Sequence, residues 1–156
     1  MKENYYHDTE YNSIYLDQDH FSPGYLCALA AYINVNKIKE KDFDTHPDNM
    51  GYLKTLGFHK VLWSIGDSIN RMNSGKNYSP LTPLIHPSEV DVANTTINRC
   101  IRNLVGNQRS EGIADLCKVV GELHDNVWSH GKSTGFSMAQ RTKVPLTNGK
   151  DHFLEF

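Results

Sequence analysis

The first clear pattern along the chain is a strand followed by a helix. Across residues 13–17, Ile14 and Leu16 alternate with Ser13, Tyr15 and Asp17. A period of two is typical of a half-buried strand. Ser22 then offers a side-chain cap and Pro23 suits the first position of a helix. The apolar face of that helix consists of Leu26, Leu29, Ala30 and Ile33.

The remainder of the first half is less regular. We expect a second strand around residues 38–43 and short helices across residues 48–63 that break at Gly57. Residues 65–82 are rich in Gly, Ser and Asn and show no sustained apolar period. The linker or domain boundary is therefore placed there.

Two long helices dominate the second half. The first is expected to open at Ser88 and to end at a cap on Gly106, and the second to run from Ser110 to Gly131. The apolar face of the first helix consists of Val90, Ala93, Ile97, Cys100, Ile101 and Leu104. The apolar face of the second consists of Ile113, Leu116, Cys117, Val120, Leu123 and Val127.

A β-hairpin is expected after these helices. Residues 134–144 contain strand formers, residues 145–151 supply turn residues, and the segment "HFLEF" at 152–156 begins another strand. The unpaired backbone groups on the exposed edge of this last strand would pair with another strand. This predicts a homodimer or other self-association.

The candidate site residues lie on the second long helix. Glu122, Asn126 and His130 follow one another at steps of four, so they form a line beside the apolar face and point away from the core. An amide oxygen such as that of Asn126 is a hard ligand suited to Mg²⁺, and a carboxylate one turn earlier can act as a general base. A solvated polar face of an amphipathic helix would contain the same residue types, and this alternative stays open.

The run "ELHDNVWSHG" at 122–131 is similar to the N box of the GHKL ATPase superfamily, the Bergerat-fold domain of sensor histidine kinases and anti-sigma-factor kinases. The order of long helix, N-box helix, strand, turn and strand also resembles that family. The resemblance implies that Asn126 is the magnesium ligand joining the metal to the phosphates of ATP. It further implies that Glu122 is the general base of hydrolysing members and that His130 is the histidine common in the kinase branch.

The family pattern is incomplete. In the family a D-x-G-x-G box, which reads adenine, directly follows a strand like "HFLEF", but this chain ends at Phe156. The segment "SGKN" at 74–77 has neither the length nor the flanking elements of a phosphate loop. We therefore expect the front part of a longer protein, inactive as an ATPase or kinase when alone.

The strand and helix of the first half, followed by "GYLKTLGFHKVL", resemble the small α/β segment akin to a STAS domain that precedes the ATPase domain in some bacterial regulatory proteins. The predicted fold is thus α/β (α+β), with a STAS-like segment over 1–82 and an incomplete Bergerat-type sandwich of two helices and a hairpin over 83–156. The resemblance implies a regulatory protein that binds Mg-ATP and acts on a partner protein. The rival interpretation is an interaction module that binds no nucleotide.

The net charge and the lengths of the apolar stretches limit the classes of partner that we expect. The 156 residues carry 16 Lys and Arg against 18 Asp and Glu, a net charge of −2, so a nucleic-acid partner is not expected. The longest apolar stretch, residues 25–33, is too short to span a bilayer, and the N-terminus has no secretory apolar core. We predict a cytoplasmic protein with no membrane contact.

Cysteines and histidines offer no local metal site. Cys27, Cys100 and Cys117 form no paired motif, so they are expected to be small buried residues. His124 and His130 are six residues apart and should lie on different faces of their helix.

Overall fold

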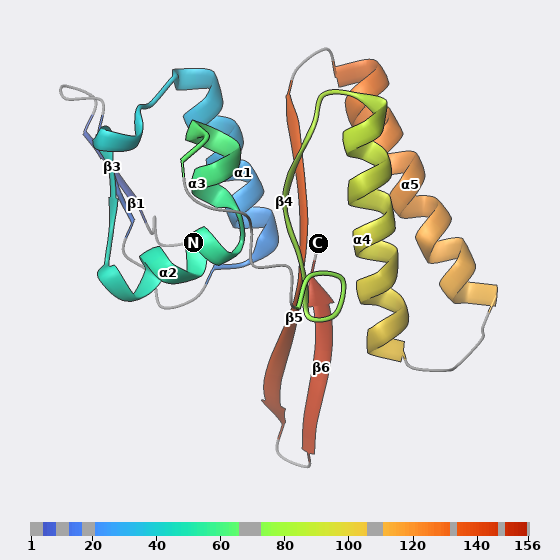
Figure 1. Ribbon diagram of the computed structural model, residues 1–156. Coiled ribbons are helices and arrows are strands. Elements are labelled where there is room, and N and C mark those ends of the chain that lie inside the picture. Colours follow the sequence, from blue (N-terminus) through green and yellow to red (C-terminus); the bar gives the residue numbers. More distant parts are fainter. Residues whose placement is uncertain are drawn as a thin grey trace.

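The computed structural model describes residues 5–8, 13–16, 21–65, 73–105, 111–131, 134–146 and 149–155. These residues form a mixed α/β fold of five α-helices, one short 3-10 helix and two three-stranded sheets (Figure 1). The caps predicted at Gly106 and Ser110 lie outside the described residues, as does the centre of the predicted turn, residues 147–148.

The first sheet contains the strand predicted from the alternating pattern. Strand β1 (Tyr5–Asp8) runs antiparallel to β2 (Ser13–Leu16), and β2 runs parallel to β3 (Phe43–Thr45). Ile14 is buried while Tyr15 is exposed, which confirms the period of two in β2. The parallel pairing requires a crossover between β2 and β3, and a helix provides it.

Helix α1 (Pro23–Asn36) is that crossover, and it begins as predicted. The Tyr25 N–H donates to the Ser22 hydroxyl oxygen at 3.3 Å, and Pro23 occupies the first helical position. The buried residues of the helix are Pro23, Leu26, Leu29, Ala30 and Ile33.

The strand predicted around residues 38–43 begins only at Phe43. Lys37 adopts a left-handed conformation with φ 54°, and the Ile38 N–H donates to a carbonyl of the last turn of α1 at 3.1 Å. This Schellman-type ending uses Ile38 as part of the helix cap. The polar residues Glu40–Asp42 then form the 3-10 helix η1 instead of extended backbone.

Two short helices follow β3 and separate where expected. Helix α2 (Pro47–Thr55) and helix α3 (Phe58–Trp63) flank Gly57, which has φ 80°. A residue with a side chain would be strained in that conformation, so Gly57 ends one helix and starts the next.

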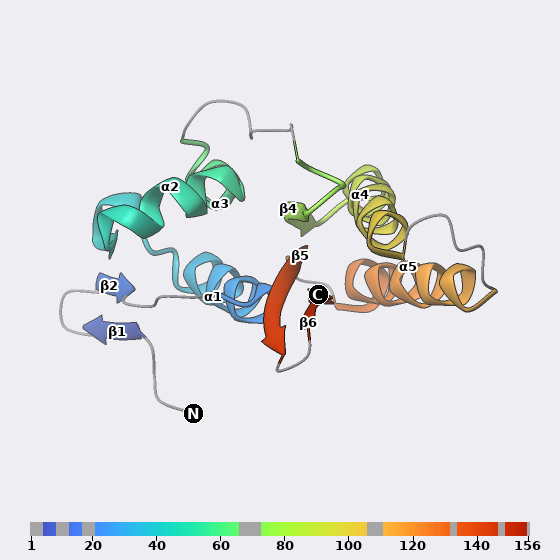
Figure 2. The same cartoon turned by 90° about the horizontal axis from the view of Figure 1, so that it is seen from below.

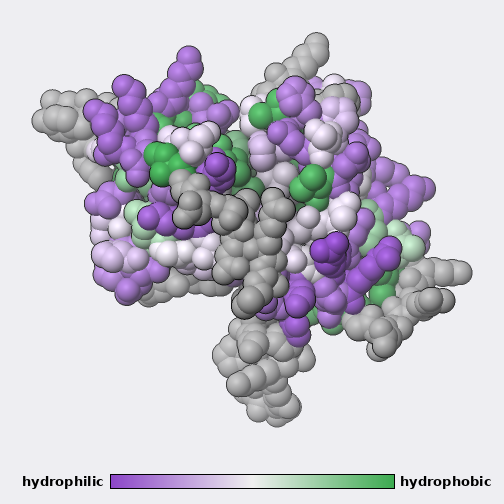
Figure 3. All heavy atoms as spheres, viewed as in Figure 1, coloured by the Kyte–Doolittle hydropathy of each residue, from purple (hydrophilic) through white to green (hydrophobic). Residues whose placement is uncertain are grey.

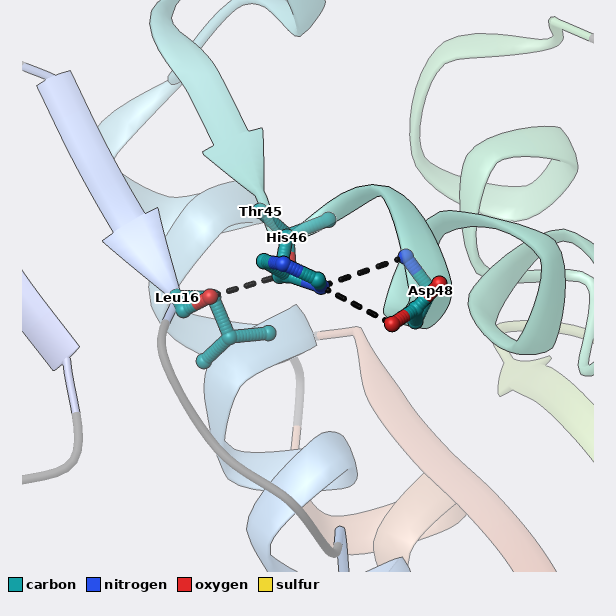
Figure 4. Close-up of polar contacts among 4 residues, drawn as sticks. All are labelled: Leu16, Thr45, His46 and Asp48. Atoms are coloured by element: carbon teal, nitrogen blue, oxygen red, sulfur yellow. Dashed lines mark hydrogen bonds and ion pairs between the residues drawn. The ribbon is translucent and has the colours of Figure 1, made fainter.

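The junction between β3 and α2 is held by polar contacts (Figure 4). The Thr45 hydroxyl donates to the Leu16 carbonyl at 3.0 Å, which ties β3 to β2. His46 caps α2, because its Nδ1 accepts from the Asp48 N–H at 3.4 Å. This histidine therefore has a local structural role.

The second sheet has the order β4-β5-β6 and is antiparallel throughout. It consists of β4 (Tyr78–Leu84), β5 (Gly135–Leu146) and β6 (Gly149–Glu155), so the predicted hairpin is confirmed. The linker expected over residues 65–82 is wrong for residues 78–82, which belong to β4. Two prolines and a register shift interrupt the alternation of apolar and polar residues in β4. Because β4 lies at the edge of the sheet, it tolerates prolines, which have no N–H donor.

The two long helices cover one face of this sheet and α1 lies against the other (Figures 1 and 2). Helix α4 (Pro87–Val105) buries the predicted residues Val90, Ala93, Ile97, Cys100 and Ile101, and the next helix is α5 (Glu111–Gly131). Leu104 is only half-buried.

The sheet joins the two halves of the chain through its side chains. Met138 of β5 and Leu81 of β4 pack in the same apolar cluster as α1, and the next residue, Ala139, packs on the opposite face with α4 and α5. The Leu81 N–H also donates to the Leu56 carbonyl at 2.9 Å. One hydrophobic cluster thus contains residues from both predicted domains, 1–82 and 83–156.

In the described part of the chain, no helix combines the length and the apolar character needed to cross a bilayer.

Candidate functional site on helix α5

The three residues singled out by their spacing lie on the exposed side of α5. The side chains of Glu122, Asn126 and His130 are all exposed. Their steps of four on a continuous helix place them in a line along one side. Among the described residues, neither Glu122 nor Asn126 makes a side-chain hydrogen bond or ion pair, so both are available to a ligand.

The inward face of α5 differs from the predicted one. Val120 is buried and Ile113 and Cys117 are half-buried, as expected. However, Leu116, Leu123 and Val127 are exposed by 42%, 58% and 37% of their surface, so the predicted apolar face is wrong at these positions. The face in contact with α4 and the sheet instead continues to His124, which is 8% exposed.

His124 replaces an apolar residue there because it joins three elements by hydrogen bonds. Its Nδ1 lies 2.6 Å from the Asn94 amide oxygen on α4, and its Nε2 lies 2.8 Å from the Ser137 hydroxyl on β5. Since the amide oxygen only accepts, Nδ1 carries the proton and Ser137 donates to Nε2. Burial lowers the pKa of His124, and the nearby Asp125 partly offsets this effect.

The sequence contains a signal for His124 that apolar periodicity alone does not detect. Ile113, Cys117, Val120 and His124 follow one another at steps of four, three and four, which is the spacing of one helix face. A histidine that continues such a face is a candidate for a satisfied buried polar group. The separation of His124 and His130 onto different faces is confirmed, because one is buried and the other exposed.

The arrangement of serine, histidine and asparagine is structural. A nucleophile with an adjacent base and an orienting group has this pattern of contacts, but Ser137 is only 7% exposed. A substrate in solution cannot reach its hydroxyl. The three residues fix α5 against α4 and β5, and thereby set which side of α5 faces outward.

Two of the three cysteines have thiols of low reactivity. Burial raises the pKa of Cys27 to about 12 and that of Cys100 to about 11, far above the range of a nucleophilic thiolate. The prediction of small buried residues is confirmed for Cys100, whereas Cys27 and Cys117 are only half-buried and pack against the core clusters.

Few side chains near the exposed face of α5 could serve a metal ion. In the described residues, no group of three or more His, Cys, Asp or Glu side chains could hold a metal ion. A magnesium ion needs less from the protein, since it keeps waters and substrate phosphates in its shell and often takes one or two protein oxygens. The exposed amide of Asn126 fits that role, with Glu122 one turn away.

Two cavities in the described part of the chain lie elsewhere. One, of about 460 Å³, is lined by the end of α1 and by α3, including Lys37 and Trp63. The other, of about 400 Å³, lies on α4. Neither is lined by Glu122, Asn126 or His130.

Comparison of the chain with protein-family models gave no match, and comparison with curated proteins and with solved structures gave no significant match either.

Proposed function

We propose that the chain is part of a regulatory protein that binds Mg-ATP on the outer face of α5 and acts on a partner protein. The observation that carries this proposal is the exposure of Glu122 and Asn126, which lie one helical turn apart and make no side-chain hydrogen bond or ion pair among the described residues. Leu123 and Val127 lie exposed next to them, so a polar pair borders an apolar surface. Nucleotide sites combine such surfaces, because the base is apolar and the phosphates are charged.

Each residue has a distinct role in this proposal. The Asn126 amide oxygen would coordinate Mg²⁺, and the metal would bring the phosphate oxygens to α5. The Glu122 carboxylate would orient or deprotonate an attacking water or hydroxyl. His130, exposed one turn beyond Asn126, would contact the phosphates from the end of the helix.

The order of elements supports the resemblance to GHKL domains. A long helix, α4, precedes α5, and the hairpin of β5 and β6 follows it. In addition, we propose that the segment over 1–82 whose sequence resembles a STAS domain, which includes the first sheet and α1, contacts the partner protein.

A second candidate function is protein interaction without a nucleotide. Leu116, Val119, Leu123 and Val127 are all exposed on α5, and a row of apolar residues on one helix is typical of a contact surface for another protein. A cytoplasmic location and a homodimer remain predictions compatible with either function.

Calorimetric titration of Mg-ATP distinguishes the two functions. We expect saturable binding to the unmodified chain and to Asn34→Ala, a control that removes an exposed asparagine from α1, and loss of binding in Asn126→Ala. Glu122→Gln should retain binding, because the amide preserves the size of the side chain and this residue is assigned to catalysis. Failure of the unmodified chain to bind Mg-ATP would favour the interaction module. Equal binding by Asn126→Ala would instead show that the nucleotide does not bind through Asn126, and would contradict the proposed site.

A further inference from the structure

A second polar groove lies on α4. It has a volume of about 400 Å³ and is lined by Thr95, Asn98, Arg99, Arg102 and Asn103. These positions recur at steps of three and four along the outer side of the helix, opposite its buried residues. Strongly hydrophilic residues gather over the C-terminal half of α4 (Figure 3).

The turn at residues 73–77 holds one wall of this groove in place. Gly75 has φ 76°, and a Cβ atom added to it would lie 2.5 Å from the Cδ of Arg99. The aliphatic part of Arg99 therefore packs directly on the glycine backbone. The Asn103 side chain donates to the Gly75 carbonyl at 2.7 Å and fastens the turn to the helix. Arg99 is thus anchored at its stem, which reduces the entropy lost when its guanidinium binds a ligand.

The groove carries the positive charges of two arginine side chains. Among the residues whose side chains are described, neither Arg99 nor Arg102 forms an ion pair. Arginine guanidinium groups bind phosphate through paired, charge-assisted hydrogen bonds. Two such groups one helical turn apart suit a single phosphate group.

One residue that lines the groove carries a side-chain acceptor without a donor. The amide oxygen of Asn98 is buried and has no hydrogen-bond partner among the described residues. A buried acceptor without a donor costs free energy. Because Asn98 lines the groove, a rotation of its amide toward the groove would let a ligand hydroxyl donate to this oxygen. Phosphate and hydroxyl groups occur together in sugar phosphates.

We propose that the α4 groove binds a small organic phosphate bearing hydroxyl groups, with Arg99 and Arg102 on the phosphate and Asn98 on a hydroxyl. This site is separate from the proposed Mg-ATP site, because it lies on a different helix and uses no metal. Since free phosphate has part of the same chemistry, the experiment must separate the contribution of the sugar from that of the phosphate.

The test is a titration without Mg²⁺, followed by NMR of backbone amides, with ribose 5-phosphate, inorganic phosphate and ribose as probes. We expect saturable shifts in α4 with ribose 5-phosphate, weaker binding of inorganic phosphate and no binding of ribose. Arg102→Gln should weaken ribose 5-phosphate binding about tenfold, since a charge-assisted hydrogen bond contributes about that factor.

Two matched controls keep the result specific. Lys118→Gln removes one exposed positive charge from α5, and Asn126→Ala removes the proposed magnesium ligand, and neither should weaken ribose 5-phosphate binding. Asn98→Leu should weaken ribose 5-phosphate binding while leaving that of inorganic phosphate unchanged. Equal weakening by Lys118→Gln and Arg102→Gln, or shifts confined to α5, would overturn the proposal, as would the absence of saturable binding.

Discussion

The two halves of the molecule bury different kinds of side chains. Around α1, α2 and α3, large apolar side chains fill the interior, and Phe43, Phe58 and Trp63 contact one another as a group of aromatic rings. Around α5, a hydrogen-bonded histidine occupies the interior while several aliphatic residues face outward. The first half is organised for packing, whereas the second half exposes apolar and polar groups together on one helix. That contrast supports the proposal that the functional surface lies on α5.

The largest expected difference between the halves is in the free energy of unfolding that is lost when a leucine side chain is truncated to alanine. Leu26→Ala should reduce the free energy of unfolding by about 2–5 kcal/mol, because Leu26 is fully buried and its removal leaves a cavity. Leu123→Ala should change it by no more than about 0.5 kcal/mol, because this side chain is 58% exposed. Urea unfolding of the two variants measures both values. A large loss in Leu123→Ala would mean that the outer face of α5 is covered in solution.

The next effect concerns the hydrogen bonds of His124. His124→Ala leaves the Asn94 oxygen and the Ser137 hydroxyl without their partner, and each unsatisfied buried group costs about 1–3 kcal/mol. His130→Ala is the matched control, since that histidine is exposed on the same helix, and it should leave stability unchanged. Equal unfolding midpoints for the two variants would contradict the assigned role of His124.

A smaller effect should appear in the pH dependence of stability. Burial lowers the pKa of both His59 and His124 in the folded state, whereas in the unfolded chain both titrate near about pH 6.5. The unfolded state therefore binds more protons just below that value. Stability should be complete above about pH 6.5 and decline as the pH falls toward the folded-state pKa values. Unfolding midpoints between pH 5 and pH 8 test this, and a midpoint that rises on acidification would contradict it.

The smallest expected effect is on the helix cap of the first half. Ser22→Ala removes the acceptor for the Tyr25 N–H and should cost about 1 kcal/mol. Ser22→Gly is a useful comparison, because glycine is tolerated at a cap and should cost only a few tenths of that value. If both variants unfold at the midpoint of the unmodified chain, the cap contributes nothing to stability.

The sequence predicted local features more accurately than the orientation of whole elements. The cap at Ser22, the break at Gly57 and the hairpin of β5 and β6 each depend on nearby residues, and all are confirmed. Strand β4 was missed because its prolines interrupt the alternating pattern, which an edge strand permits.

The orientation of α5 depends on contacts that are distant in the sequence. Asn94 and Ser137 turn His124 inward and leave Leu123 exposed, and hydrophobic periodicity cannot detect such partners. By contrast, the outward position of Glu122, Asn126 and His130 followed directly from their spacing. The spacing indicated where these side chains lie, and their roles toward a nucleotide stay predictions.

The most direct test of the central claim is an NMR titration that maps where Mg-ATP contacts the chain. We expect the shifts of the backbone amides to concentrate on α5 around Glu122, Asn126 and His130, and the amides of β1 to β3 and α1 to α3 to remain unchanged. Shifts confined to the first half, or none at saturating Mg-ATP, would contradict the assignment of α5 as the nucleotide-binding surface.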